Sequence, residues 1–107
     1  MIVVVEDPFV GKYLQTLLLR QGYDVLPAGA RRGLELLRSR DVQVDLLITN
    51  NPNAFIEFAE YLPVLYLAAF PDMDLAARFR KCRALQKPFL AAQLLSAVGD
   101  LVVVRQA

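Results

Sequence analysis

The stretch that decides the fold is residues 2–8, Ile-Val-Val-Val-Glu-Asp-Pro. Four consecutive apolar and β-branched residues predict a strand buried on both faces, as in a parallel sheet. Asp7 and Pro8 then predict a helix start, with Asp7 as N-cap and Pro8 at the first helical position. The apolar residues that follow at helical spacing are Val10, Tyr13, Leu14, Leu17 and Leu18, and Gly22 marks the end of this helix. A buried strand followed directly by a helix indicates an α/β fold.

The same alternation continues along the chain. Further strands are predicted at residues 23–26, 44–49, 63–67 and 83–86, and further helices at residues 30–39, 74–82 and 89–98. Strands that alternate with helices predict a doubly wound parallel sheet, covered on both faces through right-handed crossovers.

Two segments fit this pattern less well. Residues 51–62 are near the minimum length for a parallel crossover, so a third helix there is shortened or lost, with two turns at most over residues 54–61. Residues 101–104 are β-branched and follow Gly99, so they could extend the last helix or form a strand. The amphipathic phase through Val98, Leu101 and Val102 favours the helix.

Length and composition exclude several classes of protein. The 107 residues predict a single domain over residues 1–107, and the net charge of +1 argues against nucleic-acid binding by this domain. Histidine is absent and Cys82 is the only cysteine, which excludes histidine-based catalysis and an internal disulfide. The longest apolar run, residues 62–70, is too short to span a bilayer. Residues 1–6 lack the basic start of a signal peptide, so we expect a cytoplasmic domain with no membrane partner.

Polar residues follow the predicted strands at the edge where ligands bind in such folds. Glu6 and Asp7 follow the first strand, Asn50 the third and Lys87 the fifth, while Ala68 ends the fourth. Two adjacent acids beside a lysine could hold a hard cation together with an anion, as Mg²⁺ with phosphate requires.

Five segments, in this order and spacing, resemble the receiver domain of two-component response regulators. They are VVVED at 3–7, RQGYDVLPA at 20–28, DLLITN at 45–50, PVLYLAA at 63–69 and KPF at 87–89. The resemblance covers essentially the whole chain. It implies a flavodoxin-like five-stranded parallel sheet in the order 2-1-3-4-5, which agrees with the fold class predicted from the residues.

The resemblance also implies roles for the residues at the strand ends. Glu6 and Asp7 match the acidic pair that holds Mg²⁺, and Lys87 matches the lysine that contacts the phosphoryl group. Pro88, whose peptide bond is often cis in the family, follows it. The simpler interpretation is that Asp7 only caps the helix and that Lys87 forms an ion pair with Glu6 or Asp7.

Three matching positions lack the group that works in the family. Asn50 stands at the phosphoacceptor aspartate, Ala68 at the switch threonine or serine, and Ala84 at the switch aromatic of the fifth strand. An amide is a poor nucleophile, and its lack of charge leaves at most a weak or vestigial Mg²⁺ site. The sequence therefore predicts a degenerate receiver, a pseudo-receiver, that is not phosphorylated and acts in phosphorelay signalling by binding a protein.

A partner surface is predicted near the chain end. Arg78, Lys81 and Arg83 belong to the strongest charge run, which is either a solvated face or a docking surface. The predicted helix 89–98 has no charged residue, so we expect an apolar patch that includes Leu94 and Val98. In the family, the fourth helix, fifth strand and fifth helix form dimers, and the corresponding residues here predict a homodimer or a partner of the signalling pathway.

Two other functions remain open at this stage. The chain could be a working response regulator that is switched by Mg²⁺, or by a kinase through another residue. A small flavodoxin-like enzyme is the third hypothesis, but residues 8–11 form no glycine-rich phosphate loop and no nucleophile is evident. We therefore predict that the chain is not an enzyme.

Overall fold

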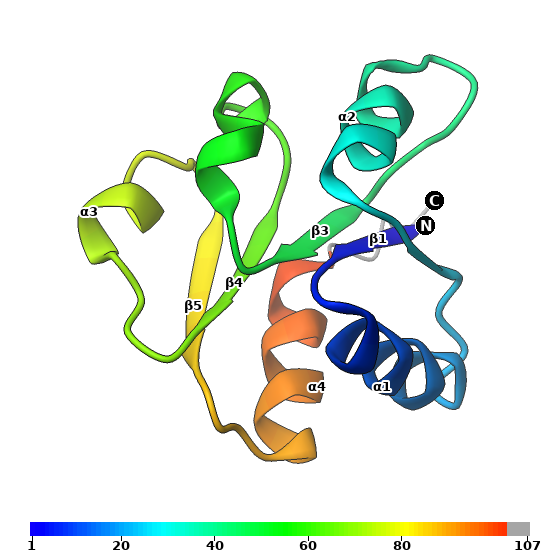
Figure 1. Ribbon diagram of the computed structural model, residues 1–107, viewed down its shortest axis with the longest axis vertical. Helices are drawn as coiled ribbons and strands as arrows, with labels where there is room; N and C mark the ends of the chain where they lie inside the picture. Colours follow the sequence, from blue (N-terminus) through cyan, green and yellow to red (C-terminus); the bar gives the residue numbers. More distant parts are fainter. Residues whose placement is uncertain (103–107) are drawn as a thin grey trace.

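The computed structural model describes residues 1–102 and contains one five-stranded parallel sheet in the order β2-β1-β3-β4-β5 (Figure 1). The strands are β1 (Ile2–Val5), β2 (Val25–Pro27), β3 (Leu46–Thr49), β4 (Val64–Ala68) and β5 (Cys82–Gln86). The helices are α1 (Pro8–Leu19), α2 (Ala30–Arg38), the 3₁₀ helix η1 (Pro52–Phe58), α3 (Met73–Ala76) and α4 (Ala91–Leu101). The predicted fold class and strand order are confirmed.

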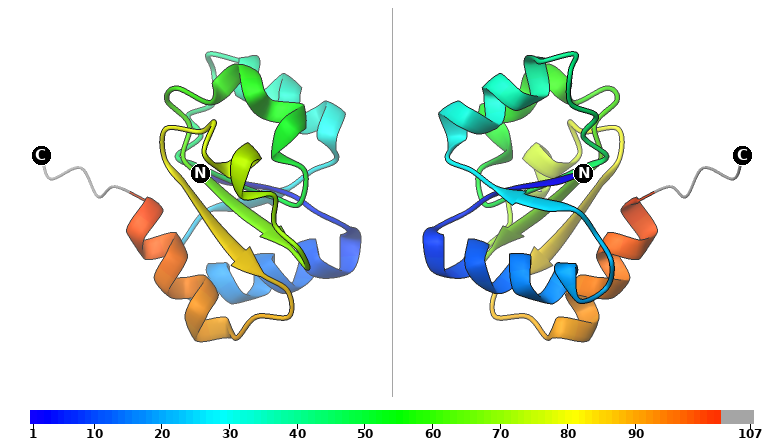
Figure 2. Two further views of the ribbon diagram at one scale, coloured as in Figure 1. Left: turned by 90° about the vertical axis from the view of Figure 1, so that its left-hand side faces the viewer. Right: turned by 90° about the vertical axis from the view of Figure 1, so that its right-hand side faces the viewer.

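Helices cover both faces of the sheet, and each face has its own apolar core. Figure 2 shows α1 and α4 together on one face, with α2 and η1 on the other. Leu14 of α1 and Leu94 of α4 pack with Ile48 on the first face. Phe55 of η1 and Leu36 of α2 pack on the second. All residues of β1 and β3 are buried, which accounts for their apolar sequences, with Thr49 as the one polar residue of the two strands.

Helix α1 begins as its sequence predicts. The Asp7 side chain accepts hydrogen bonds from the backbone N–H groups of Phe9 and Val10, and Pro8 occupies the first turn. Gly22 has a φ of 87°, a left-handed conformation that suits the chain reversal after the helix. Tyr13 departs from the prediction, because it lies outside the buried stripe and is 49% exposed.

The connection between β3 and β4 is shortened to η1, in agreement with the expectation of a shortened third helix. It differs from the predicted segment 54–61 because it starts at Pro52 and forms 3₁₀ turns. Pro52, Phe55 and Phe58 are buried, so this short segment still covers its part of the sheet. Arg38 of α2 donates hydrogen bonds to Glu57 of η1, and they lower the pKa of that carboxyl.

The predicted helix at residues 74–82 is largely wrong. Helix α3 ends at Ala76, and Cys82 already belongs to β5. Phe79 enters the second core, and the next backbone N–H, of Arg80, donates to the Ala59 carbonyl at 2.9 Å. These tertiary contacts replace the helical hydrogen bonds that the spacing of Leu75, Phe79 and Cys82 had indicated.

Helix α4 starts two residues later than predicted and continues to Leu101. The Gln93 side chain accepts a hydrogen bond from the Leu90 N–H at 2.8 Å, which caps the helix start. Extension of the helix through Leu101 is thus confirmed, whereas Val102 has an extended backbone. The rest of the predicted tail lies outside the described residues. Within residues 1–102 no helix is long and apolar enough to cross a membrane.

Candidate functional site

The polar residues predicted at the strand ends gather at one edge of the sheet. The register pairs Val5 with Thr49, so Glu6 and Asn50 leave neighbouring strands at the same level. It also pairs Ala68 with Gln86, and Lys87 follows directly. The Lys87 N–H donates to the Ala68 carbonyl at 2.8 Å, which continues the ladder to this edge. Because the strands are parallel, their carboxyl ends necessarily meet here.

Glu6 and Lys87 form the central contact of the site. The Glu6 side chain is 0% exposed, and its Oε2 lies 3.1 Å from Nζ of Lys87, which is 27% exposed. The distance is that of an ion pair, but the angles are not those of a hydrogen bond, so Oε2 has no hydrogen-bond partner within residues 1–102. The other oxygen, Oε1, accepts from the Asp7 N–H at 3.1 Å. The Lys87–Pro88 peptide bond is cis.

The Asp7 side chain caps the helix that directly follows it. Its Oδ1 accepts from the backbone N–H groups of Phe9 at 3.0 Å and Val10 at 3.1 Å. Of the two partners predicted for Lys87, the structure thus pairs the lysine with Glu6 and leaves Asp7 to cap α1. A carboxylate at this end of the helix also interacts favourably with the helix dipole.

Asn50 is exposed at the end of β3. Thr49 just before it is fully buried, and its Oγ1 accepts from the Asn51 N–H at 3.1 Å. This hydrogen bond fixes the turn that carries the Asn50 amide. An amide has the shape of a carboxylate but no charge, so this position offers neither a nucleophile nor an anionic ligand.

Tyr66 is a residue of this region that the sequence analysis missed. It is the register partner of Ala84, and its ring is buried. Its hydroxyl accepts a hydrogen bond from the Asp72 N–H at 3.2 Å, so it holds the loop between β4 and α3. A tyrosine in the otherwise apolar run PVLYL is the signal that could have pointed to it, because a buried hydroxyl requires a partner.

The residues at this edge do not fit a tight Mg²⁺ site. A hard cation prefers several oxygen ligands, and carboxylates supply the charge. Here the ammonium group of Lys87 already neutralises Glu6, Asp7 caps α1, and Asn50 is uncharged. No group of three or more His, Cys, Asp or Glu side chains able to hold a metal ion occurs within residues 1–102.

Of the residues predicted for a partner surface, only some are exposed. Arg78 and Arg83 are exposed and Lys81 is half-buried, and Arg83 forms an ion pair with Asp100 of α4. Leu94 and Val98 are fully buried in the core against the sheet, so their assignment to a surface was wrong.

The exposed side of α4 explains this error. It consists of small or polar residues, which are Ala92, Gln93, Ser96, Gly99 and Asp100. A helix can therefore face water without charged residues in most of its turns, and the expected apolar patch on α4 does not exist.

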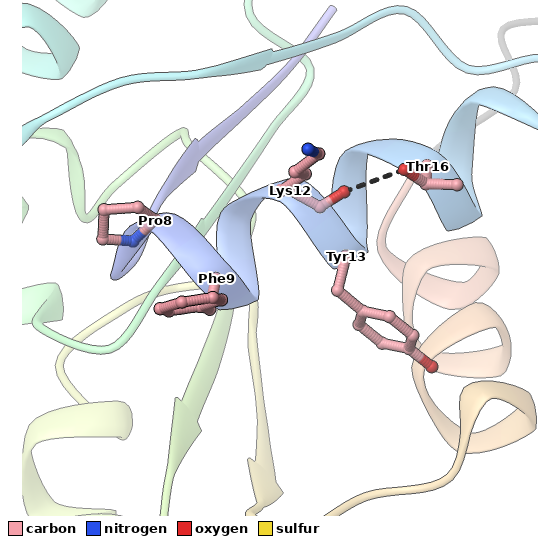
Figure 3. Close-up of a pocket in the computed structure, with 5 residues that line it drawn as sticks. All are labelled: Pro8, Phe9, Lys12, Tyr13 and Thr16. Atoms are coloured by element: carbon pink, nitrogen blue, oxygen red, sulfur yellow. Dashed lines mark hydrogen bonds between the residues drawn. The ribbon is translucent and has the colours of Figure 1, made fainter.

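Large apolar side chains are exposed at several other positions, among them Phe9 and Tyr13 of α1. Phe9 is 90% exposed and lies one helical turn before Tyr13. Together with Pro8, Lys12 and Thr16, these two rings line a surface hollow of about 470 Å³ (Figure 3). The sequence analysis grouped Tyr13 with the apolar residues at helical spacing and did not use Phe9, which lies off the buried stripe of the helix.

Known proteins resemble this chain in structure rather than in sequence. No protein-family model and no curated protein sequence matches the chain. Solved structures do match over nearly the whole chain. A response regulator receiver protein from Sinorhizobium medicae WSM419 superposes with a TM-score of 0.76, covering 94% of this chain and 91% of that one. The fold is that of a receiver domain. The sequence identity to this protein is 19%, so the likeness lies in the backbone.

Two further receiver structures support the same conclusion. The signal receiver domain of an HD domain-containing protein from Pseudomonas fluorescens Pf-5 is 25% identical, with a TM-score of 0.72 and coverage of 94% and 90%. The signal receiver domain of a signal transduction histidine kinase from Syntrophus aciditrophicus is 21% identical, with a TM-score of 0.66 and coverage of 94% and 88%. The receiver fold thus places Glu6, Asn50 and Lys87 at the edge where such folds bind ligands.

Proposed function

We propose that this chain is a receiver-like domain of a two-component phosphorelay system that is not phosphorylated and works by binding another protein. The observation that carries the proposal is Asn50 at the end of β3, level with the Glu6–Lys87 pair, in a chain with the receiver fold. Glu6 and Lys87 stand beside this position, whereas the nucleophile is absent. The expected cytoplasmic location fits this role and stays a prediction.

The chemistry of phosphoryl transfer supports the proposal that the chain is not phosphorylated. Transfer to a receiver requires a carboxylate oxygen as nucleophile, which forms an acyl phosphate. The Asn50 amide does not form one. Ala68 has no hydroxyl that could follow a phosphoryl oxygen, and Ala84 has no ring that could change position. A phosphoryl group would thus have neither an attachment point nor a side chain to move.

Binding of Mg²⁺ belongs to the same proposal. We expect at most weak binding, because Lys87 provides the positive charge next to Glu6 that a cation would otherwise supply. Weak binding also argues against the alternative of a regulator that is switched by the metal. Such a switch needs a large difference in metal affinity between two states.

Arg78 and Lys81 support the proposal that the chain binds another protein. No ion pair involves either side chain within residues 1–102, unlike Arg83, which contacts Asp100. Both lie between α3 and the start of β5, at an edge of the sheet. Unpaired cations on a surface favour a partner that presents acidic groups. A signalling protein with an acidic docking segment fits this surface.

Intact-mass spectrometry after incubation with acetyl phosphate and Mg²⁺ tests phosphorylation. The wild-type chain should gain no phosphoryl mass. The variant Asn50→Asp restores the carboxylate at an exposed position and serves as the matched comparison. A phosphoryl gain in Asn50→Asp alone supports the proposal. A gain in the wild-type chain overturns it and favours a working regulator that is phosphorylated at another residue.

A further inference from the structure

We propose that the outer edge of β5 binds an extended acidic segment of another protein, which adds to the sheet as a further strand. We define the outer edge of β5 as the backbone N–H and C=O groups of Cys82, Ala84 and Gln86. The inference rests on the proposed function for the kind of partner, a signalling protein, and it names the way in which that protein binds. It involves neither Asn50 nor phosphoryl chemistry.

The hydrogen bonds of the sheet show which backbone groups of β5 point outward. Strand β5 is the last of the sheet and pairs only with β4. In such a ladder the N–H and C=O groups of one residue point to the same side, and the next residue points to the opposite side. The Lys87 N–H donates to the Ala68 carbonyl at 2.8 Å, and the Lys81 carbonyl accepts from the other end of β4 at 3.0 Å. Odd-numbered residues thus face β4, and the even-numbered residues of the outer edge face away from the sheet.

The groups of the outer edge are open to a partner. None of these three N–H donors and three C=O acceptors forms a hydrogen bond in the part of the chain that the structure describes. Cys82 and Ala84 are half-buried and Gln86 is exposed. The left view of Figure 2 looks toward this edge and shows β5 in the foreground, between α3 and α4. A row of unpaired backbone groups at a sheet edge is the surface to which an extended segment adds as a strand.

The opposite edge of the sheet, β2, is less suited to strand addition. The Ala28 N–H donates to the Val4 carbonyl at 2.8 Å, so the even-numbered residues of this segment face β1. Val25 and Pro27 face outward, but Val25 is buried and Pro27 has no N–H group. Short length and proline are common means of protecting an edge strand. The chain thus protects one edge of its sheet and leaves the other open.

Charge indicates which kind of segment fits the outer edge. Residues 78–87 contain five lysine or arginine residues and no aspartate or glutamate. Three of the five, Arg78, Arg80 and Lys81, form no ion pair within residues 1–102. Acidic side chains on an incoming strand would therefore meet cations that no other residue neutralises. A partner segment that is both extended and acidic matches the backbone and the charge of this edge.

The same cations argue against a second copy of this chain as the occupant. If two β5 strands paired antiparallel about a two-fold axis at Ala84, Lys81 of one copy would lie opposite Lys87 of the other. In a parallel two-fold pair each cation would lie beside its own copy. Like charges opposite each other in a ladder are destabilising, and lysine at an edge strand is a common protection against self-association.

Amide hydrogen exchange measured by NMR tests the proposal residue by residue. In the free protein the N–H groups of Ala84 and Gln86 should exchange quickly, whereas that of Leu85, which faces β4, should be protected. The probe is the peptide Glu-Val-Glu-Val-Glu-Val-Glu with blocked termini. At about ten times its dissociation constant it should slow exchange at Ala84 and Gln86 about tenfold. No slowing with about 1 mM peptide overturns the proposal.

Two control peptides separate backbone pairing from charge attraction. Glu-Pro-Glu-Pro-Glu-Pro-Glu keeps the charge, but proline removes backbone donors and disfavours a strand. Lys-Val-Lys-Val-Lys-Val-Lys keeps the strand pattern and reverses the charge. Neither should slow exchange at the outer edge. Equal slowing by the proline peptide shows charge attraction without a strand and overturns the proposal. Slowing caused by higher protein concentration alone also overturns it, and the occupant is then a second copy.

Ala84→Pro tests the outer edge in the protein itself. The Ala84 N–H points outward, so proline removes a donor for the incoming strand but no hydrogen bond of the sheet. The dissociation constant of the glutamate–valine peptide should rise about tenfold. Thermal unfolding shows whether the variant keeps its fold. An unchanged dissociation constant in a folded Ala84→Pro variant contradicts strand addition.

A pair of charge variants tests the same edge without a change in the strand. The double variant Arg78→Glu/Lys81→Glu should weaken binding of the glutamate–valine peptide about tenfold or more. Arg31→Glu/Arg40→Glu is the matched control, because it changes the net charge equally at exposed positions in and after α2, which packs on β1. Equal losses in both double variants show that net charge alone attracts the peptide, and they overturn the proposal.

These outcomes can be distinguished from a failure of the proposed function. A phosphoryl gain by the wild-type chain overturns the proposed function and leaves the exchange results unaffected. Absence of slowing in a wild-type chain that takes up no phosphoryl group overturns strand addition alone.

Discussion

Glu6 carries its carboxylate in a fully buried position, with Lys87 as the nearest cation at 3.1 Å. Such a carboxylate is costly unless a positive charge compensates it. The convergence of strand ends made a contact between Lys87 and Glu6 or Asp7 predictable from the sequence. The sequence left the choice between the two acids open, although the N-cap role predicted for Asp7 favours Glu6 as the partner of the lysine.

Loss of Lys87 should therefore destabilise the fold. We expect Lys87→Met to lower the free energy of unfolding by about 3 kcal/mol, because the variant leaves a buried carboxylate without a cation. The double variant Glu6→Gln/Lys87→Met should recover most of this loss. Urea denaturation of the wild type, both single variants and the double variant measures the coupling. Losses that simply add would show that the two side chains do not interact.

Cys82 gives the fold a dependence on alkaline pH. Burial raises the pKa of its thiol to about 11. In the unfolded chain the thiol loses its proton near its ordinary value of about 8.5. Between these pH values the folded state holds more protons than the unfolded state, so the stability falls as the pH rises. Chemical denaturation of wild type and Cys82→Ala at pH 8 to 11 should show a steeper decline in the wild type, and parallel declines would contradict the shift.

At the scale of elements, α2 approaches β1 more closely than most side chains would allow. A Cβ atom at Gly33 would lie 2.8 Å from Cγ2 of Val5 and 3.5 Å from the ring of Phe55. Val5 is buried and β-branched, so it has little freedom to move away. The helical pattern of residues 30–39 predicted this helix, but its close approach to the sheet became visible only in the folded chain.

Gly33→Ala tests this close approach. Alanine favours the helix by about 1 kcal/mol over glycine, but the overlap with Val5 costs about 1–3 kcal/mol. We therefore expect a net loss of about 1 kcal/mol in the free energy of unfolding. Gly99→Ala in α4 is the control, because a Cβ atom at this position would meet no atom within 4 Å. This variant should therefore stabilise the fold. Thermal unfolding of both variants distinguishes them, and equal gains would contradict the tight packing.

At the scale of the whole molecule, the charges at the carboxyl ends of the strands should determine how strongly a metal ion stabilises the fold. A ligand that binds only the folded state raises its stability according to ligand concentration and affinity. We expect the melting temperature of the wild type to be the same in about 10 mM MgCl₂ as in NaCl of equal ionic strength. Asn50→Asp adds a carboxylate and should gain stability in MgCl₂. Saturable stabilisation of the wild type by MgCl₂ would contradict the proposed weak binding.

The sequence alone determined the alternation of strands and helices and the residues at the carboxyl ends of the strands, because continuous apolar runs, the Asp7–Pro8 cap and the geometry of parallel sheets are local or topological properties. The strand order was implied by the resemblance of the sequence to receiver domains. Asn50 could be placed at the carboxyl end of a strand because it directly follows an apolar run, and the resemblance to receiver domains implied that this is the acceptor position.

Only the tertiary structure decided which apolar side chains are core and which are surface. Leu94 and Tyr13 both fit helical spacing, yet Leu94 is buried and Tyr13 is half exposed. Periodicity gives the phase of a helix, but it does not say how far the neighbouring elements reach around it. The short α3 is a second example, since Phe79 packs in the core beside η1 after the helix has ended at Ala76. Burial is set by the whole chain, and local spacing cannot determine it.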